Sequence, residues 1–187
     1  MGTWQDGRPL FFIAHSLGGL LLAHSLQRQD GGDERSKEIV QNTRGIVFLG
    51  TPFGGSRMAG WADIANNFMT KVCEINETSI KNLKKHSEML AVIAREFPKL
   101  LVDRLKSKDK HDIDIICFFE QYSLKKNTII PGVKVSGGRV VDEESASILG
   151  YDSIGLAEDH ISMCKYEDEE RIGFVRISDQ LDQWCLI

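Results

Sequence analysis

The sequence predicts an α/β fold with a mostly parallel sheet and helices on both faces. Three short runs are apolar at nearly every position, at residues 9–14, 45–50 and 114–119. They lack the alternation of a strand with one face in water, so both faces should be buried, as in a parallel sheet. Helical patterns separate these runs, and 187 residues suit one domain, which we expect to span residues 1–187.

The first half of the chain is expected to contain three helices. A small-residue turn follows the first strand, and residues 20–29 then predict a helix that ends in turn formers. After the second strand, Ser56 is placed to cap a helix through about residue 70. A longer helical pattern covers residues 77–97, and Pro98 should stop it.

The second half of the chain is expected to contain three more strands and a final helix. The third strand ends at Glu120, a short strand covers residues 139–141, and a fourth covers residues 152–156. The last helix should span about residues 168–184. Its inward side chains are expected to be Ile172, Val175 and Leu181.

Composition excludes several classes of function. The net charge of −4 gives no reason to expect a nucleic-acid partner. No apolar run approaches the ~20 residues of a membrane span, and no signal peptide is evident, so we expect a cytoplasmic protein without a transmembrane segment. The four cysteines form no C-x-x-C pair, and we predict neither a metal site nor a cofactor.

The pentapeptide around Ser16 has the form of a nucleophile elbow. In the α/β-hydrolase fold, a serine on a sharp strand-to-helix turn projects from the sheet, and the next N–H faces the oxyanion. Small residues are expected two positions before and after the serine, here Ala14 and Gly18, because the two backbones nearly touch. An incidental serine in a glycine-rich turn is the alternative. The flanking strand and helix favour Ser16 as nucleophile and the Leu17 N–H as oxyanion donor.

The predicted general base is His160. In this fold the acid and then the histidine follow the nucleophile along the chain, and His160 comes just after the last strand. His15 adjoins the nucleophile and should point the other way. His24 and His86 fall within helical patterns, and His111 lies in a charged run.

The acid has two candidates. Glu120 directly ends the third strand, where this fold normally places the acid, and we favour it. Asp142 follows the short strand and remains the rival. The acid would hold the His160 ring in one tautomer and stabilise the imidazolium.

Four segments together resemble the lipase-like serine esterases of the serine-active-site-containing protein family. They are residues 8–19, 48–52, 141–146 and 159–165, and the resemblance extends from about residue 8 to 184. It implies Ser16 as nucleophile, His160 as base and the Thr51-Pro52 loop as a wall of the site. Such families usually carry His or Arg after that proline, whereas this chain has Phe53 and Gly54, so the local substrate contacts are not carried over.

The resemblance implies a serine hydrolase that cleaves acyl esters, including lipid esters, through an acyl-enzyme. It also implies a multi-domain parent, because such domains often precede NACHT or ankyrin-repeat regions. A complete domain of this fold has about four strands before the nucleophile strand, so we expect a domain that lacks its N-terminal strands and one oxyanion donor. Such a chain should be weak or inactive. The alternative is an inactive fragment or a signalling or interaction module that keeps the fold.

Overall fold

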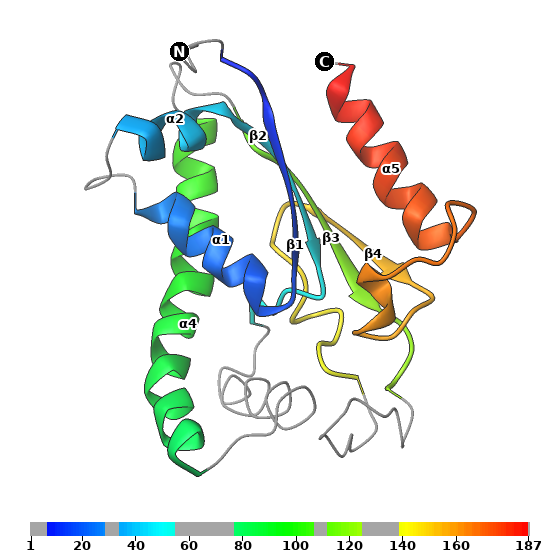
Figure 1. Cartoon of the computed structure of the whole chain (residues 1–187). Helices are drawn as coiled ribbons and strands as arrows, with labels where there is room; N and C mark the ends of the chain where they lie inside the picture. The colour runs from blue at the N-terminus through cyan, green and yellow to red at the C-terminus, as the bar shows by residue number, and fades with distance from the viewer. Residues whose placement is uncertain (1–6, 29–33, 55–76, 107–111, 125–138, 187) are drawn as a thin grey trace.

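The sheet has four strands, and all of them are parallel. A computed structural model describes residues 7–28, 34–54, 77–106, 112–124 and 139–186, with side chains from residue 89 onward in the third of these ranges. The strand order follows the chain, β1-β2-β3-β4 (Figure 1). The strands are β1 (Leu10–His15), β2 (Thr43–Leu49), β3 (Asp114–Glu120) and β4 (Asp152–Leu156). The predicted fold class, a mostly parallel α/β sheet, is confirmed.

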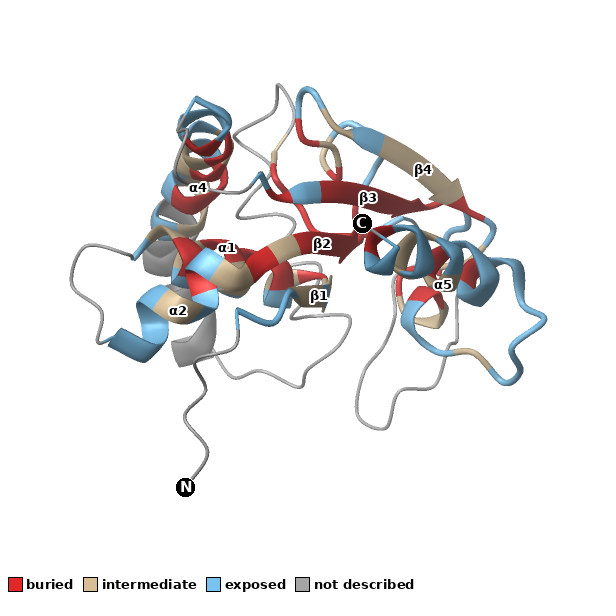
Figure 2. Cartoon of the chain, turned by 90° about the horizontal axis from the view of Figure 1, so that it is seen from above, coloured by how far each residue is buried: buried red, intermediate tan, exposed pale blue. Residues whose placement is uncertain are grey.

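Helices cover both faces of the sheet. One face carries α1 (Leu17–Gln27), α2 (Glu34–Asn42) and α4 (Glu77–Leu105), while α5 (Ile172–Cys185) covers the other (Figure 2). Helix α2 was not predicted from the sequence, because only two of its nine residues, Ile39 and Val40, are apolar, and of these only Val40 is buried. A short 3₁₀ helix, η3 (Ser162–Cys164), lies between β4 and α5.

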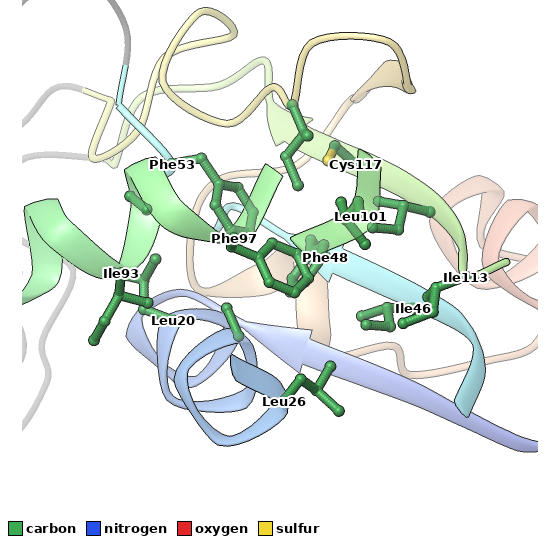
Figure 3. Packing of buried hydrophobic residues seen from close by; sticks show 14 of the residues in the cluster. Leu20, Leu26, Ile46, Phe48, Phe53, Ile93, Phe97, Leu101, Ile113 and Cys117 are labelled. Carbon is green, nitrogen blue, oxygen red and sulfur yellow. The ribbon is translucent and has the colours of Figure 1, made fainter. Parts of the chain in front are cut away.

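The two central strands pack on both sides, which explains their uninterrupted apolar sequence. In β2, Ile46 and Phe48 enter a cluster with α1 and α4, while Val47 and Leu49 enter a second cluster with α5. Figure 3 shows the first cluster, where the Phe48 ring lies 5.9 Å from the Phe97 ring, measured between centroids. A strand between two helical layers needs no polar face.

Strand β1 differs from this pattern. It pairs with β2 alone among the described strands, and most of its side chains are only half-buried. Ile13 is 53% exposed. The expectation that both faces of this first strand are buried is therefore met only in part: Phe12 and Ala14 pack on the cluster with α1 and α4 and Phe11 on the cluster with α5, but each of them is only half-buried.

Helix α4 continues through Pro98, so the prediction that this proline ends the helix is wrong. A proline inside a helix costs about 3 kcal/mol, because it removes one backbone bond and crowds the preceding turn. Phe97 and Leu101 on either side are almost completely buried against the sheet. Burial of two such side chains contributes energy of the same size, which accounts for the continued helix.

Of the three residues predicted to face inward from helix α5, Leu181 packs against the core, while the other two do not. Ile172 is 66% exposed and Val175 is 40% exposed, while Gly173, Ile177 and Trp184 point inward. A Cβ at position 173 would lie 2.5 Å from the Tyr166 hydroxyl oxygen, so only glycine allows this close approach. The helix is rotated so that Gly173, and not Ile172, packs against Tyr166 in the segment that precedes the helix.

Two expectations remain, a helix that begins at Ser56 and the absence of a membrane span. The helix predicted from Ser56 to about residue 70 lies outside the described residues. Within the described ranges, no helix combines the length and the apolar character needed to cross a bilayer.

Candidate active site

Three of the four strands deliver a chemically active side chain at their carboxyl ends. Ser16 follows β1 directly, Glu120 is the last residue of β3, and His160 lies in the loop after β4 (Figure 1). The carboxyl ends of parallel strands lie at one edge of the sheet, where ligands bind in open α/β folds. All three side chains are buried, with Glu120 and His160 at 0% exposure and Ser16 at 4%.

Ser16 occupies a strained turn. Its φ of 54° and ψ of −132° make it the one residue other than glycine with positive φ among the described residues. The Ser16 N–H donates to the Leu49 carbonyl at 2.8 Å, and the Ser16 carbonyl accepts the Gly19 N–H at 3.1 Å. Ser16 stands at the N-cap position of α1 but makes no capping bond with its side chain. Its hydroxyl is thus available for another partner.

That partner is His160. The Ser16 Oγ lies 2.9 Å from His160 Nε2, and His160 Nδ1 lies 2.5 Å from Glu120 Oε2. An ionised carboxylate can only accept, so Nδ1 carries the ring proton and Nε2 of the neutral ring accepts from the Ser16 hydroxyl. The three side chains form one continuous hydrogen-bonded chain.

Glu120 is held at both carboxylate oxygens. Its Oε1 accepts the backbone N–H groups of Val140 and Val141, the second at 3.2 Å, while its Oε2 faces His160. These bonds explain a wrong prediction, the short strand at 139–141. That segment is a bend, because its N–H groups are directed to the carboxylate and not to a neighbouring strand.

Asp142, the rival acid, bonds within its own turn. Its side chain is exposed, and its Oδ1 accepts the Ser145 N–H at 2.8 Å. Its backbone carbonyl accepts the Ala146 N–H at 2.9 Å, so Asp142 stabilises a turn. The carboxylate beside His160 therefore belongs to Glu120.

Gly50 is a site residue that the sequence analysis did not single out. It follows β2 with a φ of +53°, and its N–H donates to the Phe118 carbonyl at 2.8 Å. A Cβ there would lie 2.9 Å from His160 Nδ1 and 3.0 Å from Cε1. Only glycine permits both the turn and the histidine ring. A glycine directly after an apolar strand was the available signal.

The close approach expected at Gly18 occurs one residue later. A Cβ at Gly18 would meet open space, whereas one at Gly19 would lie 2.1 Å from Thr51 Oγ1. Helix α1 starts at Leu17, which turns Gly19 toward the loop after β2. In that loop, Phe53 is buried and its ring stands edge-on to Phe48 at 4.8 Å between centroids. Phe53 is thus a core residue.

The prediction that His15 points away from the site is wrong. Its Nε2 lies 2.8 Å from the His160 carbonyl oxygen, and the two ring centroids are 4.9 Å apart. Burial and the neighbouring His160 lower the pKa of His15 below its ordinary value of 6.5. His24 lies in α1 and His86 in α4, while His111 lies outside the described residues.

The Leu17 N–H is the candidate oxyanion donor. Leu17 is the first residue of α1, and the first N–H groups of a helix have no partner within the helix. The positive end of the helix dipole adds to their attraction for an anion. In the part of the chain that the structure describes, no group of three or more His, Cys, Asp or Glu side chains is placed to hold a metal ion.

A buried serine, histidine and carboxylate at the edge of a parallel sheet thus define the site. Among curated proteins, the chain is similar to Protein SERAC1 of Homo sapiens and of Mus musculus, each 28% identical over 169 residues. Protein SERAC1 of Danio rerio is 27% identical over the same length. Each alignment covers 90% of this chain and 23% of the relative, so the chain spans about a quarter of the length of these proteins. No family model matches.

Among solved structures, the chain is similar to a lipase-esterase related protein from Clostridium acetobutylicum. The sequence identity is 11%, the TM-score is 0.40, and the match covers 95% of this chain and 66% of that one. The fold class rests on the strand order and register given above.

Proposed function

We propose that the protein is a serine hydrolase that cleaves carboxylic esters through an acyl-enzyme. One observation carries the proposal, the unbroken chain of hydrogen bonds from Ser16 Oγ through the His160 ring to Glu120. A serine hydroxyl needs a base to remove its proton and an acid to orient that base, and this chain supplies both. The resemblance to lipase-like serine esterases supports an acyl ester as substrate.

The first half of the reaction acylates the serine. Ser16 Oγ attacks the ester carbonyl carbon while His160 Nε2 takes the hydroxyl proton, and the carbonyl oxygen becomes an oxyanion that the Leu17 N–H faces. The tetrahedral intermediate collapses as its C–O bond to the alcohol breaks. His160 returns the proton to the departing alkoxide, which leaves the acyl group on Ser16.

Water completes the reaction along the same route. His160 removes a proton from water, the hydroxide attacks the acyl carbon, and the bond to Ser16 Oγ breaks as the proton returns to that oxygen. Glu120 keeps the His160 ring oriented in both halves and stabilises the imidazolium. With its two oxygens already bonded, Glu120 needs no rearrangement when that charge appears.

The rate of ester turnover depends on how the oxyanion is stabilised. We assign one oxyanion donor among the described residues, the Leu17 N–H, and losing one of two donors costs about 2.7–4 kcal/mol of transition-state stabilisation. A low rate is compatible with the proposal, so its test must detect the activated serine itself as well as product release.

A fluorophosphonate probe provides that test, because it forms a covalent bond to an activated serine as fluoride leaves. We expect one adduct, located on Ser16 by peptide mass spectrometry, and slow hydrolysis of p-nitrophenyl butyrate. Ser16→Ala should abolish both signals. Ser25→Ala is the matched control, since Ser25 lies exposed in α1 with its hydroxyl bonded to the Leu21 carbonyl. A folded chain that shows neither labelling nor turnover at Ser16 would refute the proposal and favour a non-catalytic module.

A further inference from the structure

His15 contacts the candidate base at its backbone carbonyl and beside its ring. It is the last residue of β1, half-buried, and its Nε2 lies 2.8 Å from the backbone carbonyl of His160. Its ring is tilted by 41° against the His160 ring, with 4.9 Å between the centroids. Ser16 and His15 are adjacent in sequence, so two neighbouring residues contact His160, one at its ring Nε2 and the other at its backbone carbonyl.

The bonding partners of His15 determine its tautomer. A carbonyl oxygen can only accept, so Nε2 of His15 carries a proton. The Nδ1 atom of the neutral ring then has a lone pair, and Cys164 Sγ lies 3.8 Å from it. Burial raises the pKa of the Cys164 thiol, so the sulfur keeps its single proton. That proton is directed to the Ile161 carbonyl at 3.4 Å, so the sulfur is only a close neighbour of Nδ1, and the hydrogen-bond partner of His15 is the His160 carbonyl at Nε2.

We propose that neutral His15 is a positioning residue for His160. It fixes the His160 backbone through the Nε2–H bond and supports the ring face, which keeps His160 Nε2 directed at Ser16 Oγ. The inference rests on the proposed function for its catalytic consequence. The contact between the two histidines stands on its own geometry.

The charges around His15 agree with a neutral ring. The groups that face it are His160, Glu120, Lys165 and the Cys164 thiol. Burial and then the charge of His160 lower the pKa of His15, the hydrogen bond to the His160 carbonyl and the charge of Glu120 raise it, Lys165 lowers it, and the pKa is lowered on balance. His15 therefore stays neutral above its lowered pKa, and adds no second positive charge when His160 becomes an imidazolium during the reaction.

Substitution of His15 by glutamine and by asparagine distinguishes the role of its Nε2 atom from that of its Nδ1 atom. A glutamine amide nitrogen reaches about as far as imidazole Nε2, whereas an asparagine amide reaches only to Nδ1. His15→Gln should keep the bond to the His160 carbonyl and remain within about threefold of the natural rate, whereas His15→Asn should lose up to about 100-fold. The loss should fall on kcat, with KM little changed, because His15 positions the base and does not bind the ester.

Nuclear magnetic resonance of the histidine rings gives a readout that needs no turnover. In long-range ¹H–¹⁵N spectra of the 187-residue chain, His160 should be the Nδ1–H tautomer, with a strongly deshielded proton in the bond to Glu120. His15→Gln should preserve this signature, and His15→Asn should broaden or abolish it at an unchanged melting temperature. If the Ser16 reaction fails but this pattern holds, the proposed function is wrong and the positioning contact remains.

Two results would overturn the inference. One is that Asn and Gln at position 15 leave the labelling rate of Ser16 and the His160 spectrum the same as in the natural chain. The other is that both variants lose rate and melting temperature equally, which would show that His15 only supports the fold.

Discussion

Strands β1 and β3 contribute the proposed nucleophile and the proposed acid, and the two strands differ in how deeply they are buried in the sheet. β3 is central and buried at six of its seven positions, whereas β1 lies at an edge and is mostly half-buried. Glu120 at the end of β3 is fully buried and accepts two backbone N–H groups. Ser16 at the end of β1 is held by backbone bonds to Leu49 of β2 and to Gly19 of α1. The proposed acid thus belongs to the buried centre of the sheet, and the proposed nucleophile to the turn between β1 and α1.

The largest expected effect comes from changing the acid. In Glu120→Gln, one carboxylate oxygen becomes an NH₂ group that must face either the His160 N–H or the backbone N–H groups of residues 140 and 141, and both are donors. We expect kcat to fall by about 10³-fold or more. Asp142→Asn is the control and should change kcat by less than about threefold, since its carboxylate caps an exposed turn. A larger loss in Asp142→Asn, measured by ester hydrolysis and probe labelling, would transfer the acid role to Asp142.

The packing difference between edge and centre is tested by one substitution made at two positions. Ile46 in β2 is fully buried, and Ile13 in β1 is 53% exposed. Ile46→Ala should lower the free energy of unfolding by about 2–5 kcal/mol, because it leaves a cavity in the core. Ile13→Ala should cost less than about 1 kcal/mol. Urea denaturation of both variants measures the difference, and equal losses would mean that β1 is packed as tightly as β2.

The same substitution at two glycines with positive φ distinguishes the cost of backbone strain from the cost of crowding the His160 ring. At Gly150, φ is +92° and a Cβ would meet open space, so Gly150→Ala should cost about 1–2 kcal/mol of stability and no activity. At Gly50, the same change adds a contact of 2.9 Å with His160 Nδ1. We expect a larger loss of about 2–4 kcal/mol and a kcat lower by about tenfold. Thermal melts and probe labelling measure both effects, and equal activity of the two variants would show that His160 can move aside.

The smallest expected effect is a difference in alkylation between the buried thiol of Cys117 in β3 and the exposed thiol of Cys185. Burial raises the pKa of Cys117 in β3 to about 12, so below that pH the thiol is protonated and unreactive. Iodoacetamide at pH 8 should modify the exposed Cys185 while Cys117 stays unmodified until the chain is denatured. Peptide mass spectrometry before and after denaturation reads each cysteine separately. Early modification of Cys117 would mean that β3 opens far more easily than its burial indicates.

Sequence patterns predicted the four sheet strands to within a few residues, because three of them are short apolar runs between turn formers. The residues 139–141 were mistaken for a strand for the same reason: Val140 and Val141 are apolar, but their N–H groups bond to Glu120, which is distant in sequence. Pro98 failed as a helix stop because burial on both sides of it outweighs a local preference. Both differences depend on contacts with residues that are distant in sequence, and a short stretch of sequence contains no information about them.

The placement of the candidate site was more predictable than its surroundings. Ser16, Glu120 and His160 each follow a strand, and parallel strands end at one edge of a sheet, so chain order alone brings them near each other. The contacts of Gly50 and His15 with His160 were not predictable in this way. They depend on how one side chain turns within the loop after β4, and periodicity carries no information about that orientation.

The hydrogen bond between Ser16 and His160 joins residues that are 144 positions apart, and this distance has a consequence for synthesis. On the ribosome, the serine leaves the exit tunnel long before its base has been made, so a nascent chain carries an ordinary, unreactive hydroxyl. Contacts of high sequence separation also form late in folding, since a long loop must close first. We therefore expect reactivity of Ser16 to be the last property that the chain acquires on folding. The rate at which the fluorophosphonate adduct of Ser16 appears during refolding would then report when β4 packs onto the sheet.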